Sequence, residues 1–138
     1  MVPKAASKIL LGAVALLGLI NLMRGSIHFF APDGGLTNIA GLDISQNRDV
    51  ILFFIGAVGA GQITMGLIEL YAVWRYRDYV FPLLILHLVG SVLSLFLFFV
   101  WRPLPVVPPG QYGAVVSFVF FGLIAAREIY LRAKHDGA

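Results

Sequence analysis

The chain has 138 residues, of which 59% are hydrophobic and 12% are charged, and its mean hydropathy is +0.90. Soluble domains average about 45–50% apolar and about 25% charged residues, so this composition excludes an ordinary water-soluble domain. No cysteine is present, which excludes disulfides, thiolate catalysis and cysteine-ligated metal sites. The formal net charge of +3 is too small to indicate nucleic acid as a partner.

The first long apolar segment predicts a membrane-spanning helix over residues 8–30. It follows a basic start, Lys4 and Lys8, which signal peptides also show. No A-x-A cleavage site follows, and the apolar stretch continues to Phe29 and Phe30. These two features favour an uncleaved first helix over a signal peptide.

The connection over residues 31–48 is the longest polar stretch and begins with the turn signal Pro32-Asp33-Gly34-Gly35. Four apolar residues recur in it at a spacing that suits a short amphipathic segment on the membrane surface: Leu36, Ile39, Ala40 and Ile44. Such a segment would cap a pocket that opens near His28. The alternative is a surface loop whose apolar residues rest on the bundle.

Three further spans are predicted, over residues 49–74, 80–101 and 111–131. The first of these contains small residues that let a neighbouring helix approach closely: Gly56, Gly59, Gly61 and Gly66. The short charged turn over residues 75–79 predicts that the second and third spans form an antiparallel hairpin. Four prolines within residues 102–110 predict a stiff, extended connection before the last span.

The distribution of cations predicts how the chain is oriented. Most of the Lys and Arg residues lie at one end of the spans, namely Lys4, Lys8, Arg75, Arg77, Arg127, Arg132 and Lys134, against Arg48 and Arg102 at the other end. The positive-inside rule places the first group, and with it both termini, in the cytoplasm. The predicted fold is therefore all-α, a four-helix transmembrane bundle in up-down-up-down order. It forms a single integral membrane domain over residues 1–138.

Four ionisable residues lie within the spans, where each needs a buried partner or water: Arg24, His28, Glu69 and His87. Asn21, Arg24 and His28 follow i, i+3, i+7 spacing and share one face of the first helix. Arg24 is about 9 Å below the outer end of its helix at a rise of 1.5 Å per residue. Its side chain therefore either points into the bundle or extends to the membrane surface.

The second and third spans each carry a polar face of their own. Gln62 and Glu69 are seven residues apart and share a face with Gly59 and Gly66. His87 shares a face of the third span with Ser91 and Ser94. Counted from the turn near residue 76, Glu69 is about 11 Å and His87 about 16 Å into the membrane, close enough for a side-chain pair.

Three interpretations of these buried polar residues stay open. They hold the helices together by hydrogen bonds, or they form a pocket for the polar head of an amphipathic molecule, or they transfer protons through Glu69 and His87. A metal site is not expected, because His28 and His87 lie at different depths and a catalytic zinc ion usually needs three ligands at one point.

The pattern Gly18-x5-Arg24-Gly25-x2-His28-Phe29-Phe30, followed by three more apolar spans, resembles the DoxX-like group of small bacterial four-helix membrane proteins. Some members of that group are associated with quinone-linked oxidoreductases or oxidative-stress membrane complexes. The resemblance implies a multi-pass protein of the bacterial inner membrane and points to Arg24 and His28 as functional positions.

The leading functional hypothesis is a non-enzymatic accessory subunit or binding protein for a quinone- or lipid-like ligand. Its predicted ligand-binding residues are Asn21, Arg24, His28 and Gln62. No cofactor is assigned beyond a bound quinone or lipid, and the expected partners are membrane lipids together with a larger membrane complex or further copies of the chain. Two alternatives remain: a membrane isomerase or reductase with Glu69 and His87 as catalytic acid and base, and a proton-coupled transporter that works as an oligomer.

Overall fold

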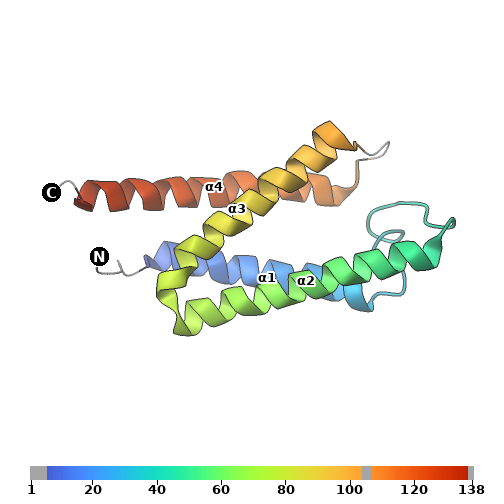
Figure 1. The fold of residues 1–138 in the computed structure, drawn as a ribbon, viewed down its shortest axis with the longest axis horizontal. Helices are drawn as coiled ribbons and strands as arrows, with labels where there is room; N and C mark the ends of the chain where they lie inside the picture. Colours follow the sequence, from blue (N-terminus) through green and yellow to red (C-terminus); the bar gives the residue numbers. More distant parts are fainter. Residues whose placement is uncertain (1–5, 104–106, 137–138) are drawn as a thin grey trace.

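The computed structural model describes residues 6–103 and 107–136, which contain four long helices (Figure 1). They are α1 (Lys8–Phe30), α2 (Arg48–Arg75), α3 (Val80–Phe96) and α4 (Pro109–Asp136). Taken with the short turns at its two ends, α3 covers Arg77–Trp101, and each of the four segments is then long and apolar enough to cross a membrane. The predicted all-α fold and its four spans are confirmed.

The beginning of α1 and the end of α4 lie at the same end of the molecule (Figure 1), as four crossings require. Which side of the membrane this end occupies stays a prediction. Two parts of the sequence argument, Lys4 as a cation of this end and residues 104–106 of the proline-rich connection, lie outside the described residues.

A polar contact ties the start of α1 to α4. Ser7 caps α1 by accepting a hydrogen bond from the backbone N–H of Leu10 at 3.1 Å, and its hydroxyl donates to Glu128 Oε1. Glu128 is only 4% exposed, and the same oxygen lies 2.7 Å from Arg127 Nη1. From the sequence, Arg127 was predicted only as a cation of this end of the bundle, and Glu128 was not predicted to be buried.

Helices α1 and α2 lie side by side over most of their length (Figure 1), and glycines on both helices allow this. A Cβ atom on Gly25 would lie 2.7 Å from Gly59 O, and one on Gly66 would lie 2.7 Å from Gly18 O. The predicted close approach at Gly59 and Gly66 is thus confirmed. Gly56 and Gly61 contribute nothing to it, because a Cβ atom at either position would meet open space.

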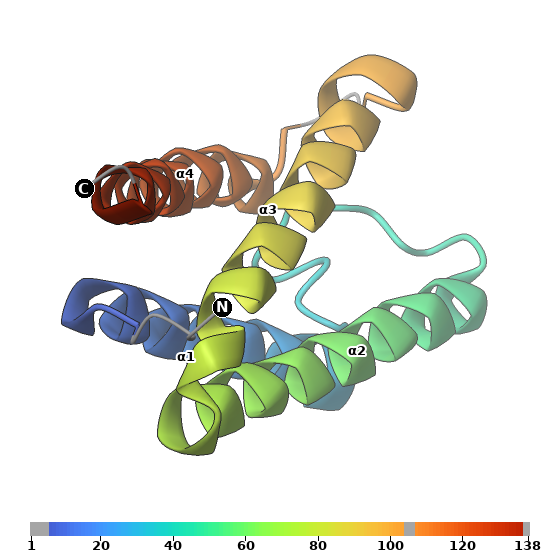
Figure 2. The ribbon, with the colours of Figure 1, turned by 60° about the vertical axis from the view of Figure 1, so that its left-hand side comes forward.

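The predicted hairpin of the second and third spans is only half right. The tight turn is present as a 3-10 turn (η1, Arg77–Tyr79), but α3 then leans away from α2 (Figures 1 and 2). The physical reason is that the close-packing residues of α2, Gly59 and Gly66, face α1. Helices in lipid gain little from packing one large apolar surface against another, so α3 has no comparable site on α2.

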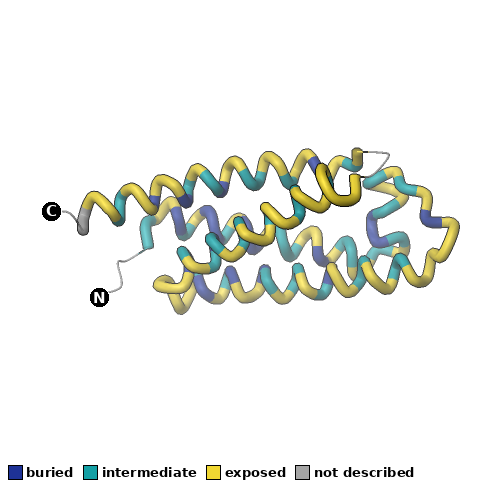
Figure 3. Tube along the Cα trace, turned by 45° about the horizontal axis from the view of Figure 1, so that its top comes forward, coloured by how far each residue is buried: buried dark blue, intermediate teal, exposed yellow. Residues whose placement is uncertain are grey.

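The buried core lies in the half of the bundle that contains the termini (Figure 3). It consists of Leu10, Ala13, Val14, Leu17, Ala72, Val80, Leu84, Phe121 and Ala125. No residue of α3 beyond Leu84 is buried, and the helix ends in a wider π-helical turn (η2, Leu97–Trp101). In the other half α1 and α2 still pack closely at Gly25 and Gly59, but α3 contributes no buried residue there, and the pocket described below lies in that half.

Candidate functional site

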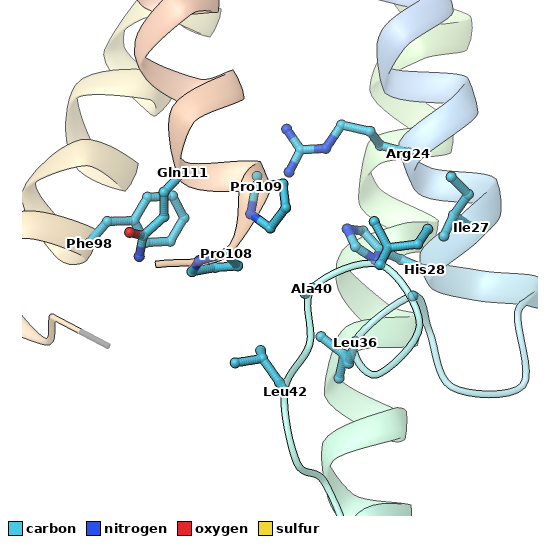
Figure 4. Close-up of a pocket in the computed structure, with 13 residues that line it drawn as sticks. Arg24, Ile27, His28, Leu36, Ala40, Leu42, Phe98, Pro108, Pro109 and Gln111 are labelled. Carbon is cyan, nitrogen blue, oxygen red and sulfur yellow. The ribbon is translucent and has the colours of Figure 1, made fainter. Parts of the chain in front are cut away.

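A pocket of about 250 Å³ lies at the end of the bundle opposite the termini (Figure 4). Its lining comes from the last turns of α1, the connection between α1 and α2, the η2 turn and the first turn of α4. Most of the lining is apolar or glycine, and its three polar residues are Arg24, His28 and Gln111. This mixture suits a ligand that has both an apolar and a polar part.

The α1 wall of the pocket carries Arg24 and His28, which lie one helical turn apart on the same face. Between them Gly25 packs against α2, which orients α1 so that the two polar side chains face the pocket. The side chain of Arg24 extends away from α1 toward Pro109 (Figure 4). Arg24 thus lines the pocket while its side chain remains exposed.

His28 is fixed by the connection that follows α1. Its Nδ1 lies 2.8 Å from the carbonyl oxygen of Gly34. Because a carbonyl oxygen only accepts hydrogen bonds, Nδ1 carries the proton in this contact and donates. Nε2 is then the ring nitrogen left for a ligand.

The connection between α1 and α2 forms hydrogen-bonded turns over the pocket. Asp33 organises them: its carboxylate accepts from the backbone N–H of Asn38 at 2.8 Å and of Gly35 at 3.0 Å. These two bonds, Asn38 first, lower the pKa of Asp33 below its ordinary value. Gly34 and Gly35 both have positive φ (60° and 75°), and a Cβ atom at either would press on an isoleucine side chain, so glycine is needed at both.

The predicted apolar residues of this connection divide between two places. Leu36, Ile39 and Ala40 line the pocket close to His28, whereas Ile44 is buried and is not among the lining residues. The segment therefore covers the pocket, as one interpretation predicted. The segment forms a series of turns and not a helix. Its apolar residues rest on the bundle, as predicted for a surface loop.

The opposite wall contains Gln111, which the sequence analysis did not single out. This residue lies in the first turn of α4 and is only 3% exposed, and its Nε2 has no hydrogen-bond partner in the described structure. The amide lies beside Phe98 and Pro108 (Figure 4). One sequence signal could have identified Gln111 as a pocket residue: it is a polar residue directly after Pro109-Gly110, at the start of a span.

A second polar cluster joins α1, α2 and α3 nearer the other end. Asn21 Nδ2 donates to Glu69 Oε2 at 2.8 Å, and His87 Nδ1 lies 3.8 Å from Glu69 Oε1. Glu69 is fully buried, and its Oε1 has no hydrogen-bond partner. The predicted proximity of Glu69 and His87 is confirmed. The His87 ring also lies edge-on to Phe121 of α4.

The four predicted ligand-binding residues are thus separated in space. Arg24 and His28 line the pocket, whereas Asn21 and Gln62 are not part of its lining. Asn21 is bonded to Glu69 instead, and Gln62 has a buried Oε1 without a partner. Asn21 shares a helix face with Arg24 and His28, but it does not reach the pocket. At the depth of Asn21 its side chain meets Glu69 of α2 and bonds to it.

Replacing Asn21 by leucine is expected to lower the free energy of unfolding by about 1–3 kcal/mol, because it leaves Glu69 buried with neither oxygen hydrogen-bonded. The double variant Asn21→Leu/Glu69→Leu removes both partners and should recover part of this loss. Unfolding in mixed detergent micelles measures the free energies of unfolding of the single and the double variant.

Ser94→Ala is the matched control, because the Ser94 hydroxyl donates only to Gly90 O in its own helix. Its effect should stay within about 0.5 kcal/mol. If the Asn21→Leu protein is as stable as the Ser94→Ala protein, the contact between Asn21 and Glu69 does not hold α1 and α2 together.

Within the described residues, no three His, Cys, Asp or Glu side chains gather in a way that would hold a metal ion. Comparisons of the chain with protein-family models, with curated proteins and with solved structures found no match, so the resemblance to the DoxX-like group stays a prediction.

Proposed function

We propose that the protein is a small binding subunit of a bacterial inner membrane that holds the polar head of a quinone- or lipid-like molecule in the pocket beside Arg24 and His28. The observation that carries the proposal is the composition of that pocket. An apolar lining surrounds one permanent cation and one imidazole, both on α1. Cofactor and lipid sites have this character, with a few polar groups that orient a mainly apolar ligand.

The surroundings of the pocket support the same function. The pocket lies at the open end of the bundle, and long stretches of α2 and α3 expose large apolar residues such as Phe53, Leu93 and Val100. These surfaces suit contact with lipid tails or with other subunits. Membership of a larger membrane complex, or assembly with further copies of the chain, is part of the proposal.

Filling the pocket should displace the ligand. We expect a quinone or a specific lipid to co-purify with the wild-type protein and to be lost from the Ala40→Trp variant, because Ala40 lines the pocket. Mass spectrometry of organic extracts measures the amount of quinone or lipid bound per protein molecule. Adding the extracted compound at about a hundredfold over its Kd should stabilise the wild type by about 2.7 kcal/mol.

The matched control is Ala57→Trp, since Ala57 is exposed on α2 and is not a lining residue. This variant should retain the ligand. A wild-type extract without any enriched compound, together with melting that neither quinones nor lipids change, would exclude the proposed function.

A second candidate function rests on the contact of Glu69 with His87. A fully buried carboxyl group beside an imidazole is an arrangement that general acid–base catalysis uses. The candidate is an isomerase or reductase of an apolar substrate. The cluster that joins the two residues also contains Asn21, which positions Glu69 Oε2 and leaves Oε1 toward His87.

A further inference from the structure

We infer that the pocket selects amphipathic molecules whose headgroup is a compact anion, a carboxylate or a phosphate, over neutral molecules such as quinones. This inference rests on the proposed function and specifies its ligand. It is carried by the charges and the unpartnered donors of the pocket lining.

The first step is the charge balance of the pocket. Arg24 is its one permanent cation, and no Asp or Glu is among the lining residues. In the described part of the chain, Arg24 has no hydrogen bond or ion pair of its own. A cation within a span is costly unless it meets an anion or water, and an oxyanion accepts two hydrogen bonds from a guanidinium group at once. A neutral headgroup offers the Arg24 guanidinium no opposite charge.

The second step is the wall that faces Arg24. The first turn of α4, from Pro109 to Gln111, lines the pocket. The N-terminal turn of a helix has a partial positive charge and attracts anions. A helix terminus alone does not define a site, but here Gln111 adds a buried Nε2 donor without a partner. Figure 4 shows Arg24 extending from α1 toward this turn, while the Gln111 amide lies on the Phe98 side of the turn.

The third step concerns the loop above the pocket, where acidic groups would otherwise oppose an anion. Asp33 and Asp43 are the acidic residues that flank the lining part of the loop. Both carboxylate oxygens of Asp33 accept from backbone N–H groups of the loop, and Asp43 Oδ1 accepts from the backbone N–H of Ser45. The carbonyl oxygen of Gly34 is bonded to His28. These acceptors are therefore already engaged within the loop.

The size of the pocket agrees with a headgroup. A volume of about 250 Å³ is at the low end for sites that enclose a whole ligand of drug size. It accommodates a carboxylate or phosphate with its first methylene groups against Leu36, Ile39 and Phe98. The rest of an acyl chain would lie outside the pocket.

The test compares three headgroups on one C18 chain, and adds a quinone. Full-length protein in a neutral maltoside detergent is titrated with oleate, oleyl phosphate, oleyl alcohol and decylubiquinone, and binding is followed by thermal shift and calorimetry. We expect at least one of the two anions to bind about tenfold or more tightly than the alcohol and the quinone. Preference between the anions distinguishes a fatty acid carboxylate from a phospholipid phosphate.

Variants of the two donor walls complete the test. Arg24→Gln should weaken binding of the preferred anion about tenfold or more and leave binding of oleyl alcohol nearly unchanged. Gln111→Leu should weaken the anion by a smaller factor. The matched control Arg102→Gln removes an exposed cation at the same end of the bundle that is not a lining residue, and it should bind like the wild type. If Arg24→Gln does not fold, Arg24→Lys keeps the charge and should still prefer the anion.

Three results would overturn the inference, and they differ in what they say about the proposed function. Equal or tighter binding of decylubiquinone, still sensitive to Ala40→Trp, would exclude selection for an anion and keep the binding function. Absence of saturable binding for all four compounds would exclude both. Equal losses in Arg24→Gln and Arg102→Gln would show attraction of anions to the surface alone, and would also overturn the inference.

Discussion

Replacing Gly25 by leucine is expected to separate α1 from α2 and to cost about 3 kcal/mol or more, at the upper end of the range for overpacked cores. A Cβ atom at this position would lie 2.7 Å from Gly59 O and 2.8 Å from Ile63 N. Both are backbone atoms of α2, so no side-chain rearrangement relieves the clash. Because α1 also carries Arg24 and His28, the pocket should be lost with the helix packing. Unfolding by denaturing detergent and ligand co-purification measure the two effects.

Two other glycines serve as controls for Gly25→Leu. A Cβ atom on Gly12 of α1 or on Gly61 of α2 meets nothing within 4 Å, so Gly12→Leu and Gly61→Leu introduce the same side chain without a clash. Both variants should be close to the wild type in stability. If Gly25→Leu is as stable as either of them, α1 and α2 do not pack through Gly25 and Gly59 in the membrane.

If the protein is an enzyme, Glu69→Gln is expected to lower turnover about 10²- to 10⁴-fold, the usual contribution of a general acid or base. The variant should remain folded, because a glutamine oxygen still accepts the hydrogen bond that Asn21 donates to Glu69 Oε2. What is lost is the titratable carboxyl group whose Oε1 lies 3.8 Å from His87 Nδ1, and a bridging water or a small approach would let the two groups exchange a proton. Complementation of a deletion strain provides the measurement when the substrate is not known.

Glu128→Gln is the matched control for this experiment. Glu128 is the other buried carboxyl group of the described chain, and its hydrogen bonds are with Ser7 and Arg127 and not with His87. The Glu128→Gln protein should keep its activity even if its stability falls. Full complementation by the Glu69→Gln variant would eliminate the acid–base function and leave Asn21, Glu69 and His87 as a structural cluster.

The two polar clusters lead to different kinds of function. The pocket at Arg24 and His28 is bordered by a loop and by the first turn of α4, and it is a preformed cavity of about 250 Å³. The cluster at Glu69 is enclosed by α1, α2 and α3, and its carboxyl group has no exposed surface. Binding at the first cluster needs no rearrangement, whereas a substrate at the second would need the helices to separate. For this reason binding is the function that we place first.

Several features of the fold were predictable because they are properties of single segments. The first span, residues 8–30, coincides with α1, since the hydrocarbon core of a membrane requires about 20 consecutive apolar residues. The shared face of Arg24 and His28 follows from helical periodicity alone. Counting residues on both sides of one tight turn predicted that Glu69 and His87 lie at similar depths in the membrane. The 3.8 Å distance between Glu69 Oε1 and His87 Nδ1 confirms that they are close.

Other features depended on how one helix lies against another, and the sequence pattern misjudged them. Asn21 shares a helix face with Arg24, yet it bonds Glu69 because α2 crosses α1 at that level. Ser91 was considered as polar company for His87, but its hydroxyl donates to the backbone carbonyl of His87 one turn earlier, a bond that any helical serine can make. Gln111 became a pocket residue only because the first turn of α4 faces α1.

The sequence by itself determined that this is a membrane protein of four helices and which side chains share a face on each of them. It did so because hydropathy, span length and the 3.6-residue period depend only on neighbouring residues. The tertiary structure alone decided that α3 leans away from α2, that a pocket opens beside Arg24, and that Gln111 faces that pocket. These features depend on how the helices tilt and rotate against one another, and for α1 and α2 that packing is set jointly by Gly18, Gly25, Gly59 and Gly66.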